Sequence, residues 1–293
     1  MKFKKASIIG SITLLFLLII IVIILYNFIG PGSRDIKASK NFITNLYSIN
    51  AIDTEQNLDA IKYERIKILN SQNDLVYRSI ITQSFGIDLD KNNNVIGFAR
   101  KEIPTNTTKF NLQDARILAE RYLENIYNGE VVLKTINRND GSKYLPYYSF
   151  IYTKQKDGHP FYFDEIKLNI DKENGFLDGY SNSTMQRECK ESIINLSEEE
   201  AKNAALEYFE KFNKDGIVGN ETDLVYADNK IDKDASKIYE VCYIVNIDGK
   251  NDNDVNISWK IFVSSENGNI LNILKDGEEK EAIIKWDKRD DNQ

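Results

Sequence analysis

The sequence predicts an α+β protein in which an N-terminal transmembrane helix is followed by tandem units, each a helix packed on an antiparallel sheet. Three observations lead to this fold class. An uncharged apolar run covers residues 6–30, which is long enough to cross a bilayer. Two amphipathic segments begin at the capping residues Asn111 and Ser197. Stretches with alternating apolar and polar side chains end in Glu-Asn-Gly turns, which is typical of antiparallel hairpins.

Composition sets the broad class of the protein. The chain has 293 residues, of which 42% are hydrophobic and 11% aromatic, so it can form folded domains. Its formal net charge of −7 argues against nucleic acid as a partner, because phosphate backbones bind basic surfaces. Anionic lipid would not attract the acidic region after the apolar run either.

The apolar run is predicted to be an uncleaved membrane anchor. Three lysines precede it and a Pro-Gly-Ser stretch follows it. The positive-inside rule places the N-terminus in the cytoplasm and the region after Gly30 outside. The alternative is a cleaved signal peptide, but residues 25–28 lack the small-x-small site that cleavage requires. We therefore expect residues 1–30 to form a short cytoplasmic tail and a single-pass anchor.

Residues 31–104 are predicted to form a stalk and a degenerate first repeat. A helix is expected near the start of this stretch because Phe42, Leu46 and Ile49 share one helical face. The remaining pattern indicates strands that end in polar turns. The expected features are a helix over 34–50, strands over 61–69 and 75–85, a hairpin over 85–98 and a polar boundary at 104–108.

A helix-then-hairpin unit is then used twice. Asn111 and Asp114 open the first helix, and Ser197 with Glu200 forms a capping box that opens the second. The helices match at a spacing of 86 residues and the hairpins at a spacing of 93. Such internal similarity indicates a repeated supersecondary unit. The matched pairs include Ala115 with Ala201, Ala119 with Ala205, Tyr122 with Tyr208, Lys167 with Lys260, and Gly175 with Gly268.

This repeat predicts one unit over residues 105–190, a second over 191–276 and a charged tail over 277–293. Strands at 238–247 and 257–263 are expected to lead to the last hairpin. The stripe of apolar residues on the second helix indicates its buried face. That face is expected to carry Ala201, Ala204 or Ala205, Tyr208 and Phe212.

Several motifs resemble those of a known family. Residues 196–201 read LSEEEA, and residues 257–263 read ISWKIFV before the turn ENGNI. They resemble the opening helix and the closing hairpin of the PepSY domain. Residues 161–180 resemble the middle repeat of the membrane-anchored spore-germination PepSY proteins and of YcdB/YcdC-type proteins. A weaker similarity connects the chain to YycH/YycI-type regulators of a sensor kinase. The resemblance implies a helix on an antiparallel sheet and a role in binding or inhibition, not catalysis.

No metal site or cofactor is predicted. The single histidine, His159, lies in a sequence typical of a turn, without the nucleophile context of a catalytic triad. Residues 88–94 resemble a calcium loop but lack its glycine and its final glutamate. The acidic stretch 248–254 is either a calcium loop or a solvated insertion between strands. The carboxylates of residues 198–200 are those of an ordinary first helical turn.

The two cysteines, Cys189 and Cys242, leave two alternatives open. They would be able to form one disulfide outside the cytoplasm, where the redox environment permits it. Two separate buried thiols are the other reading. Neither belongs to a CxxC motif, and one histidine cannot complete a Cys/His zinc set.

The aromatic-rich stretch 144–163 is the candidate recognition surface. Neighbouring residues in a strand face opposite sides, so some of its rings are expected to lie outside the core. Exposed aromatic side chains are typical of protein-binding sites. The alternative is that they form the sheet core and cross-strand pairs. The candidate partner-binding residues are Tyr148, Tyr152 and Tyr162.

These features favour a membrane-anchored extracytoplasmic binding protein that modulates or inhibits an envelope peptidase or a cell-wall or cortex hydrolase. The alternative is a regulator of a membrane sensor kinase of the YycH/YycI type. An enzyme is disfavoured, because the candidate nucleophiles, bases and metal ligands do not form a set.

Overall fold

The computed structural model describes residues 18–20, 32–53, 62–64, 78–101, 107–137, 145–184, 187–231 and 238–275. Within these ranges, no helix has both the length and the apolar character that crossing a bilayer requires. Apart from residues 18–20, the expected anchor lies outside the described residues, as does the charged tail.

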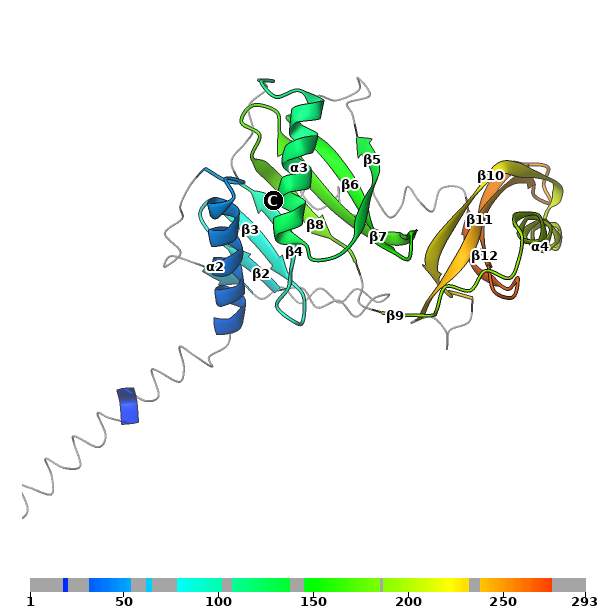
Figure 1. Ribbon diagram of the computed structural model, residues 1–293, viewed down its shortest axis with the longest axis horizontal. Coiled ribbons are helices and arrows are strands. Elements are labelled where there is room, and N and C mark those ends of the chain that lie inside the picture. Colours follow the sequence, from blue (N-terminus) through cyan, green and yellow to red (C-terminus); the bar gives the residue numbers. More distant parts are fainter. Residues whose placement is uncertain are drawn as a thin grey trace, which may run out of the picture. The chain divides into compact units, whose positions relative to one another are not determined.

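The chain divides into two compact units. Unit 1 contains the described residues up to Asn128, together with Thr135–Ile151 and Lys167–Asn182. Unit 2 contains Gly129–Lys134, Tyr152–Ile166 and the described residues from Ser183 onward. Both have mixed α+β structure, as the sequence predicts. Figure 1 shows a helix lying along one face of the sheet in each unit.

Unit 1 begins with the expected helix, α2 (Ser33–Ser48). Its buried apolar residues are Ile43 and Leu46, while Phe42 packs edge-on against Phe98 at a ring separation of 5.8 Å. The strands that follow are β1 (Lys62–Glu64), β2 (Arg78–Ile81), β3 (Phe85–Leu89) and β4 (Val95–Arg100).

The expected single strand over residues 75–85 is wrong. β2 ends at Ile81, and Phe85 already begins β3. The cause is a tight turn in which Thr82 and Phe85 exchange hydrogen bonds: the Phe85 amide donates to Thr82 Oγ1 at 2.9 Å, and the Thr82 amide donates to the Phe85 carbonyl at 2.9 Å. Local hydrophobicity did not distinguish one long strand from two short ones joined by this turn.

The first helix-and-hairpin repeat is α3 (Leu112–Ile126), β5 (Val131–Asn137), β6 (Tyr147–Lys156), β7 (His159–Asp171) and β8 (Leu177–Asn182). Asn111 caps α3 by accepting a hydrogen bond from the Asp114 amide at 2.9 Å. Each strand neighbours the next along the chain, and β8 also pairs with β4 in an antiparallel manner. The base of the β6–β7 hairpin belongs to unit 1 and its tip to unit 2.

The second repeat lies wholly in unit 2. After β9 (Glu188–Cys189) come α4 (Glu198–Glu210), β10 (Lys214–Asp228), β11 (Ile238–Lys250), β12 (Asn256–Ser264) and β13 (Ile270–Lys275). The last four strands form an antiparallel meander in chain order. α4 packs on one face through Ala201, Ala205 and Phe209, each 0% exposed.

Two features of the second repeat differ from expectation. Phe212 is 56% exposed instead of buried, because α4 ends at Glu210 and the chain has left the helical periodicity by that point. Strand β10 was not expected, since only its last four residues form a continuous buried run. Its first part is polar and glycine-containing, a composition that does not suggest a strand.

The predicted turn correspondence is confirmed in detail. Gly175 and Gly268 have φ values of 75° and 77°, the left-handed region in which glycine has no steric penalty. The Gly175 amide donates to the Asp171 carbonyl at 3.0 Å, and the Gly268 amide donates to the Ser264 carbonyl at 3.0 Å. The two hairpins therefore share a closing geometry at the predicted spacing. The unit boundaries expected from the repeat stay a prediction.

Candidate binding surface

The sequence elements that superficially suggested chemistry have structural roles. Asp157 and Gly158 have φ values of 51° and 80° and form the two-residue turn between β6 and β7, as such tight hairpins require. His159 is the first residue of β7, with its ring 6.3 Å from that of Tyr226. The predicted turn is confirmed, and His159 is part of its exit.

The two acidic loops are also turns. Asp90 Oδ1 accepts hydrogen bonds from the amides of Asn92 and Asn94, each at 2.8 Å, so the carboxylate closes the β3–β4 hairpin. Asn251 Oδ1 does the same in the β11–β12 turn, with the amides of Asn253 and Val255 at 2.9 and 3.1 Å. In the described part of the chain, no group of three or more His, Cys, Asp or Glu side chains is arranged to hold a metal ion.

The carboxylates at the start of α4 belong to its cap. Glu200 Oε2 accepts a hydrogen bond from the Ser197 amide at 2.8 Å, and Ser197 Oγ accepts one from the Glu200 amide. The bonds that the Ser197 amide and hydroxyl donate to the Glu200 carboxylate lower the pKa of Glu200. The predicted capping box is therefore confirmed, and its Glu200 carboxylate is stabilised as an anion rather than tuned for proton transfer.

The cysteines are both free. Cys242 is buried in unit 2, and burial raises the pKa of its thiol well above the ordinary value. Cys189 is half-buried in β9. In this structure the two residues correspond to the alternative of separate thiols.

The three candidate tyrosines have different surroundings. Tyr148, in unit 1, is half-buried: its hydroxyl donates to the Phe110 carbonyl at 3.2 Å, and Lys172 Nζ lies 4.9 Å from its ring centre. Tyr152 is only 3% exposed, so in this structure it belongs to the core and not to a binding surface. Tyr162, in unit 2, is half-buried among other aromatic side chains.

Tyr162 belongs to an aromatic cluster that also contains Phe163 and Phe262. Tyr162 lies edge-on to Phe163 at 4.9 Å and to Phe262 at 5.0 Å, and Phe163 is 5.5 Å from Phe262. These spacings are those of favourable aromatic pairs. Phe262 is 0% exposed and anchors the cluster, while the other two rings reach the surface. Because α4 packs against the residues that alternate with Phe262 along β12, the cluster lies on the sheet face without the helix.

The two surface rings are adjacent in sequence, which simple strand alternation does not predict. Along β7 the buried residues are Phe161, Asp164 and then every second residue, so the alternation slips by one position between 161 and 164. A slip of this kind is typical of a β-bulge, which redirects side chains. It allows Tyr162 and Phe163 to contact the same partner ring.

Buried contacts on both sides of the pair hold it in place. Before it, Phe161 is stacked on Tyr226 at a ring separation of 4.7 Å. After it, Asp164, which is 1% exposed, accepts a hydrogen bond from the Tyr239 hydroxyl at 2.6 Å. Burial and the Asp164 carboxylate raise the pKa of Tyr239, so this hydroxyl stays a donor. The backbone on either side of Tyr162 and Phe163 is therefore fixed.

Lysines surround the aromatic pair. Lys134 Nζ lies 4.8 Å from the Tyr162 ring centre, and Lys260 Nζ lies 5.9 Å from the same ring. Lys230 Nζ lies 4.4 Å from the Phe163 ring centre. All three distances are within the range of cation–π attraction. We call Tyr162, Phe163, Phe262 and these three lysines the aromatic–lysine cluster.

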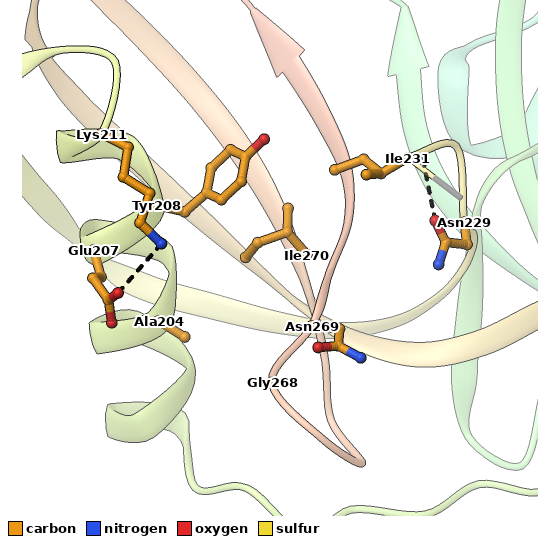
Figure 2. A pocket seen from close by; sticks show the side chains of 9 residues that line it. All are labelled: Ala204, Glu207, Tyr208, Lys211, Asn229, Ile231, Gly268, Asn269 and Ile270. Carbon is orange, nitrogen blue, oxygen red and sulfur yellow. Dashed lines mark hydrogen bonds and ion pairs between the residues drawn. The ribbon is translucent and has the colours of Figure 1, made fainter. Parts of the chain in front are cut away.

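Each unit has a hollow that is lined by described residues. One, of about 450 Å³, lies beside α4 in unit 2. Figure 2 shows Tyr208 projecting from α4 over this hollow toward Ile231, with Ile270 next to it. Lys211 Nζ pairs with Glu207 at 3.3 Å, and both residues also line this hollow.

The other hollow, of about 250 Å³, lies in unit 1 and is polar. Arg100 and Asp178 line it, and Arg100 also lies 3.6 Å from Asp171. Burial raises the pKa of Asp178 from 3.8 to about 6; the attraction of Arg100 opposes this rise and the repulsion of Asp171 adds to it. Burial thus brings the pKa of this carboxyl group toward neutral pH, and Lys167 and Ser181 line the same hollow.

Comparison with known proteins places few limits on function. No protein-family model and no curated protein matches the chain. Among solved structures, it is similar to the Bacillus megaterium YpeB C-terminal domain, with 17% sequence identity and a TM-score of 0.44. The match covers 78% of this chain and 95% of that one. A likeness this loose carries no activity, ligand or partner over to this chain.

Proposed function

We propose that the chain is an extracytoplasmic binding protein, held at the membrane by residues 6–30 and built from two PepSY-like units. Its role is to modulate or inhibit an envelope enzyme, either a peptidase or a cell-wall or cortex hydrolase. It acts by binding and not by turnover. The family resemblance of the sequence motifs and the repeated helix-on-sheet architecture support this proposal.

The aromatic–lysine cluster is the observation that carries it. Tyr162 and Phe163 are half-buried at the surface, although the residues on either side of them are tied into the core. Rigid aromatic side chains lose little conformational entropy on binding and are frequent in the energetic centres of interfaces. A pre-positioned pair that packs on the buried residues of the sheet and still reaches the surface is suited to contact a partner.

The polar groups discussed above favour a scaffold over a catalyst. Asp90, Asn251 and Glu200 accept hydrogen bonds from the backbone of their own turn or cap. The Asp164 carboxylate is engaged as well, because it accepts a hydrogen bond from the Tyr239 hydroxyl. Groups engaged in this way stabilise local structure, whereas a general base needs access to a proton on a substrate.

The test is capture of the partner by the full-length protein in the membranes of its native organism. The double variant Tyr162→Ser, Phe163→Ser should lower the yield of crosslinked partner by about tenfold or more, because central aromatic contacts dominate interface energies. Tyr148→Ser is the matched control: the sequence also suggested Tyr148 as a partner-binding residue, but its hydroxyl is bonded to Phe110 within unit 1 and it lies outside the cluster. His159→Ala should leave the phenotype unchanged.

Melting temperatures of the variants separate loss of binding from loss of folding. Tyr162→Lys and Phe163→Lys, made singly, provide a second route, because a long side chain can keep its stem on the sheet while it alters the surface. The proposal is wrong if folded cluster variants capture the partner as well as Tyr148→Ser does. It is also wrong if the purified protein hydrolyses peptide or glycan by itself and His159→Ala removes that activity.

A further inference from the structure

The polar hollow of unit 1 occupies a place that larger side chains fill in the second repeat. There, Phe262 on β12 lies opposite Asn272 on β13, and the two residues are 0% and 4% exposed. At the spacing of 93 residues, the matching positions in the first repeat are Asn169 and Gly179. Both of these smaller residues line the hollow of about 250 Å³. The first repeat therefore keeps open a space that the second repeat closes.

Gly179 is the residue that keeps this space open. It is not among the glycines with a positive φ, so the backbone at this position would accept another residue. A Cβ atom there would lie 3.1 Å from Asn169 Nδ2 and 3.7 Å from the Phe98 carbonyl oxygen. A side chain on Gly179 would thus extend into the space beside Asn169. A glycine inside a strand is typical of a place that a ligand or another backbone approaches closely.

Hydrogen-bonding side chains from three strands line the hollow. They are Arg100 on β4, Lys167 and Asn169 on β7, and Asp178 and Ser181 on β8. The Ser149 hydroxyl donates to Asn169 Oδ1 at 2.8 Å, while Asn169 Nδ2 is the atom nearest to Gly179. The lining therefore offers an ammonium group and an amide as donors, a carboxyl group as acceptor, and a hydroxyl that does both.

The charged groups in the lining have opposite signs. Arg100 lies 3.6 Å from the buried Asp171 and also attracts Asp178. A small anion in the hollow would meet the carboxyl group of Asp178, and a small cation would meet Arg100 and Lys167. Each kind of ion is repelled by part of the lining. An uncharged ligand that carries both donors and acceptors meets all of these groups without such repulsion.

We propose that this hollow binds one ring of a carbohydrate. Its hydroxyl groups donate to Asp178 and accept from Lys167 and from the Asn169 amide, because a hydroxyl group is both donor and acceptor. Tyr147 also lines the hollow and offers an apolar surface to the carbon atoms of the ring. The volume of about 250 Å³ is slightly below the usual range for drug-sized ligands, about 300–1,000 Å³, which suits a single ring.

This binding would be a second activity beside the proposed one. Every residue that lines the hollow belongs to unit 1, whereas the aromatic–lysine cluster belongs to unit 2. The carbohydrate site therefore depends on neither the aromatic pair nor the lysines around it.

Titration with monosaccharides tests the proposal. The full-length protein, in a detergent without a sugar headgroup, is titrated with glucose, galactose and N-acetylglucosamine, and saturation-transfer NMR measures binding. At least one sugar should bind with a dissociation constant on the order of 1 mM, which is typical of a ligand with so few atoms. Cyclohexanol is the matched control ligand, since it is a ring with one hydroxyl group. It should bind at least about tenfold more weakly, because most groups of the lining then have no partner.

Variants assign the binding to the hollow. Gly179→Asn introduces the residue found at the matching position of the second repeat, and it should lower the affinity at least about tenfold by occupying the ligand's place. Gly86→Asn is its matched control on β3 of the same unit, where an added Cβ meets nothing within 4 Å. The double variant Lys167→Met, Ser181→Ala removes two groups of the lining and should also lower the affinity at least about fivefold.

Several outcomes would overturn the proposal. It is wrong if no sugar binds more tightly than cyclohexanol, or if folded Gly179→Asn and Gly86→Asn bind sugar equally well. Melting temperatures show whether each variant is folded. If Gly179→Asn is not, unchanged sugar binding by the double variant at positions 167 and 181 overturns the proposal. The ligand class is wrong if alanine, a zwitterion, or inorganic phosphate binds more tightly than the sugars and loses its affinity in the same variants.

Discussion

The two helix-and-hairpin repeats agree on the face that packs against the helix and differ on the other face. On the helix side, Ala115 and Ala201 are both 0% exposed, as are Leu168 and Ile261 on the strands beneath. The chain entering each helix is also bonded in the same way. The amide of Phe110 donates to the Lys172 carbonyl at 2.9 Å, and that of Leu196 donates to the Ser265 carbonyl at 3.0 Å.

On the face without the helix, the matched positions have different chemistry. Asn169 in the first repeat is half-buried and accepts a hydrogen bond from Ser149 Oγ at 2.8 Å. Phe262, its counterpart 93 residues later, is 0% exposed and lies at the centre of the aromatic–lysine cluster. Asp178, with its raised pKa, matches Leu271, which is 1% exposed.

The difference between the two faces shows which side chains the repeat requires in order to fold. Close approach of helix and sheet requires small residues on the helix and apolar residues beneath, so both copies keep them. The opposite face is packed differently in the two repeats: buried apolar residues line it in the second repeat, and mostly polar residues line the hollow on it in the first. The matched side chains on this face are therefore polar in one repeat and apolar or aromatic in the other.

The sharpest test of this contrast compares Phe262→Ala with Asn169→Ala. Removal of the Phe262 ring should destabilise unit 2 by about 3–5 kcal/mol, because it leaves a cavity among buried side chains. Asn169→Ala should cost unit 1 only about 0.5–1.5 kcal/mol, the contribution of a typical hydrogen bond. Hydrogen exchange of the strand amides measures each unit separately. Equal losses would contradict the view that only the second repeat uses this face for packing.

The second test asks whether the helix faces are equivalent. Ala115→Leu and Ala201→Leu should each destabilise by about 1–3 kcal/mol and by similar amounts, because both methyl groups lie in fully packed positions. Chemical denaturation followed by circular dichroism gives the comparison. Ala204→Leu is the control on the same helix, since its half-buried side chain borders the hollow beside α4 and has room to grow. A large loss at only one of the two matched alanines would break the correspondence.

The smallest expected effect concerns the pH dependence of stability at Asp178, the residue of the first repeat that matches Leu271 of the second. A carboxyl group whose pKa rises from 3.8 to about 6 on folding binds its proton more tightly in the folded state. Its contribution to stability is therefore present at low pH and is lost as pH rises between about 4 and 6. Asp178→Asn should raise the melting temperature by a few degrees at about pH 7.5 and change it little at about pH 3.5, below both pKa values.

The control for this pH effect is Asp254→Asn, which alters an exposed carboxylate in the β11–β12 turn. It should not produce the same difference between the two pH values. If Asp178→Asn instead lowers the melting temperature at both pH values, the attraction between Asp178 and Arg100 exceeds the cost of burial. In that case the polar face of the first repeat is optimised for stability in its own right.

Several elements were predictable because their determinants are local. The caps at Asn111 and Ser197, the left-handed glycines at 175 and 268, and the Asp157–Gly158 turn each depend on a few neighbouring residues. Their positions were correct. The boundary between β2 and β3 was missed, because Thr82 can close a turn without glycine or proline to mark it.

Elements that depend on distant contacts were harder to predict. β10 is held by pairing with β11, so its polar first half becomes a strand through the partner and not through its own composition. Tyr152 has the same residue type as Tyr162 and lies in the same hairpin, yet one is in the core and the other at the surface. Strand alternation did not separate them, because the slip in β7 changes which residues face inward.

The sequence by itself determined the repeated helix-then-hairpin order, the caps and turns, and the α+β class, since these follow from periodicity and from short-range hydrogen bonding. It also identified Tyr162 as a candidate. Only the tertiary structure decided that Phe262 and Lys260 meet Tyr162 and Phe163 from about 100 residues away in the chain, with Lys134 and Lys230 on either side. The physical reason is that strand pairing joins residues irrespective of their separation in sequence, and no local pattern records which strands will become neighbours.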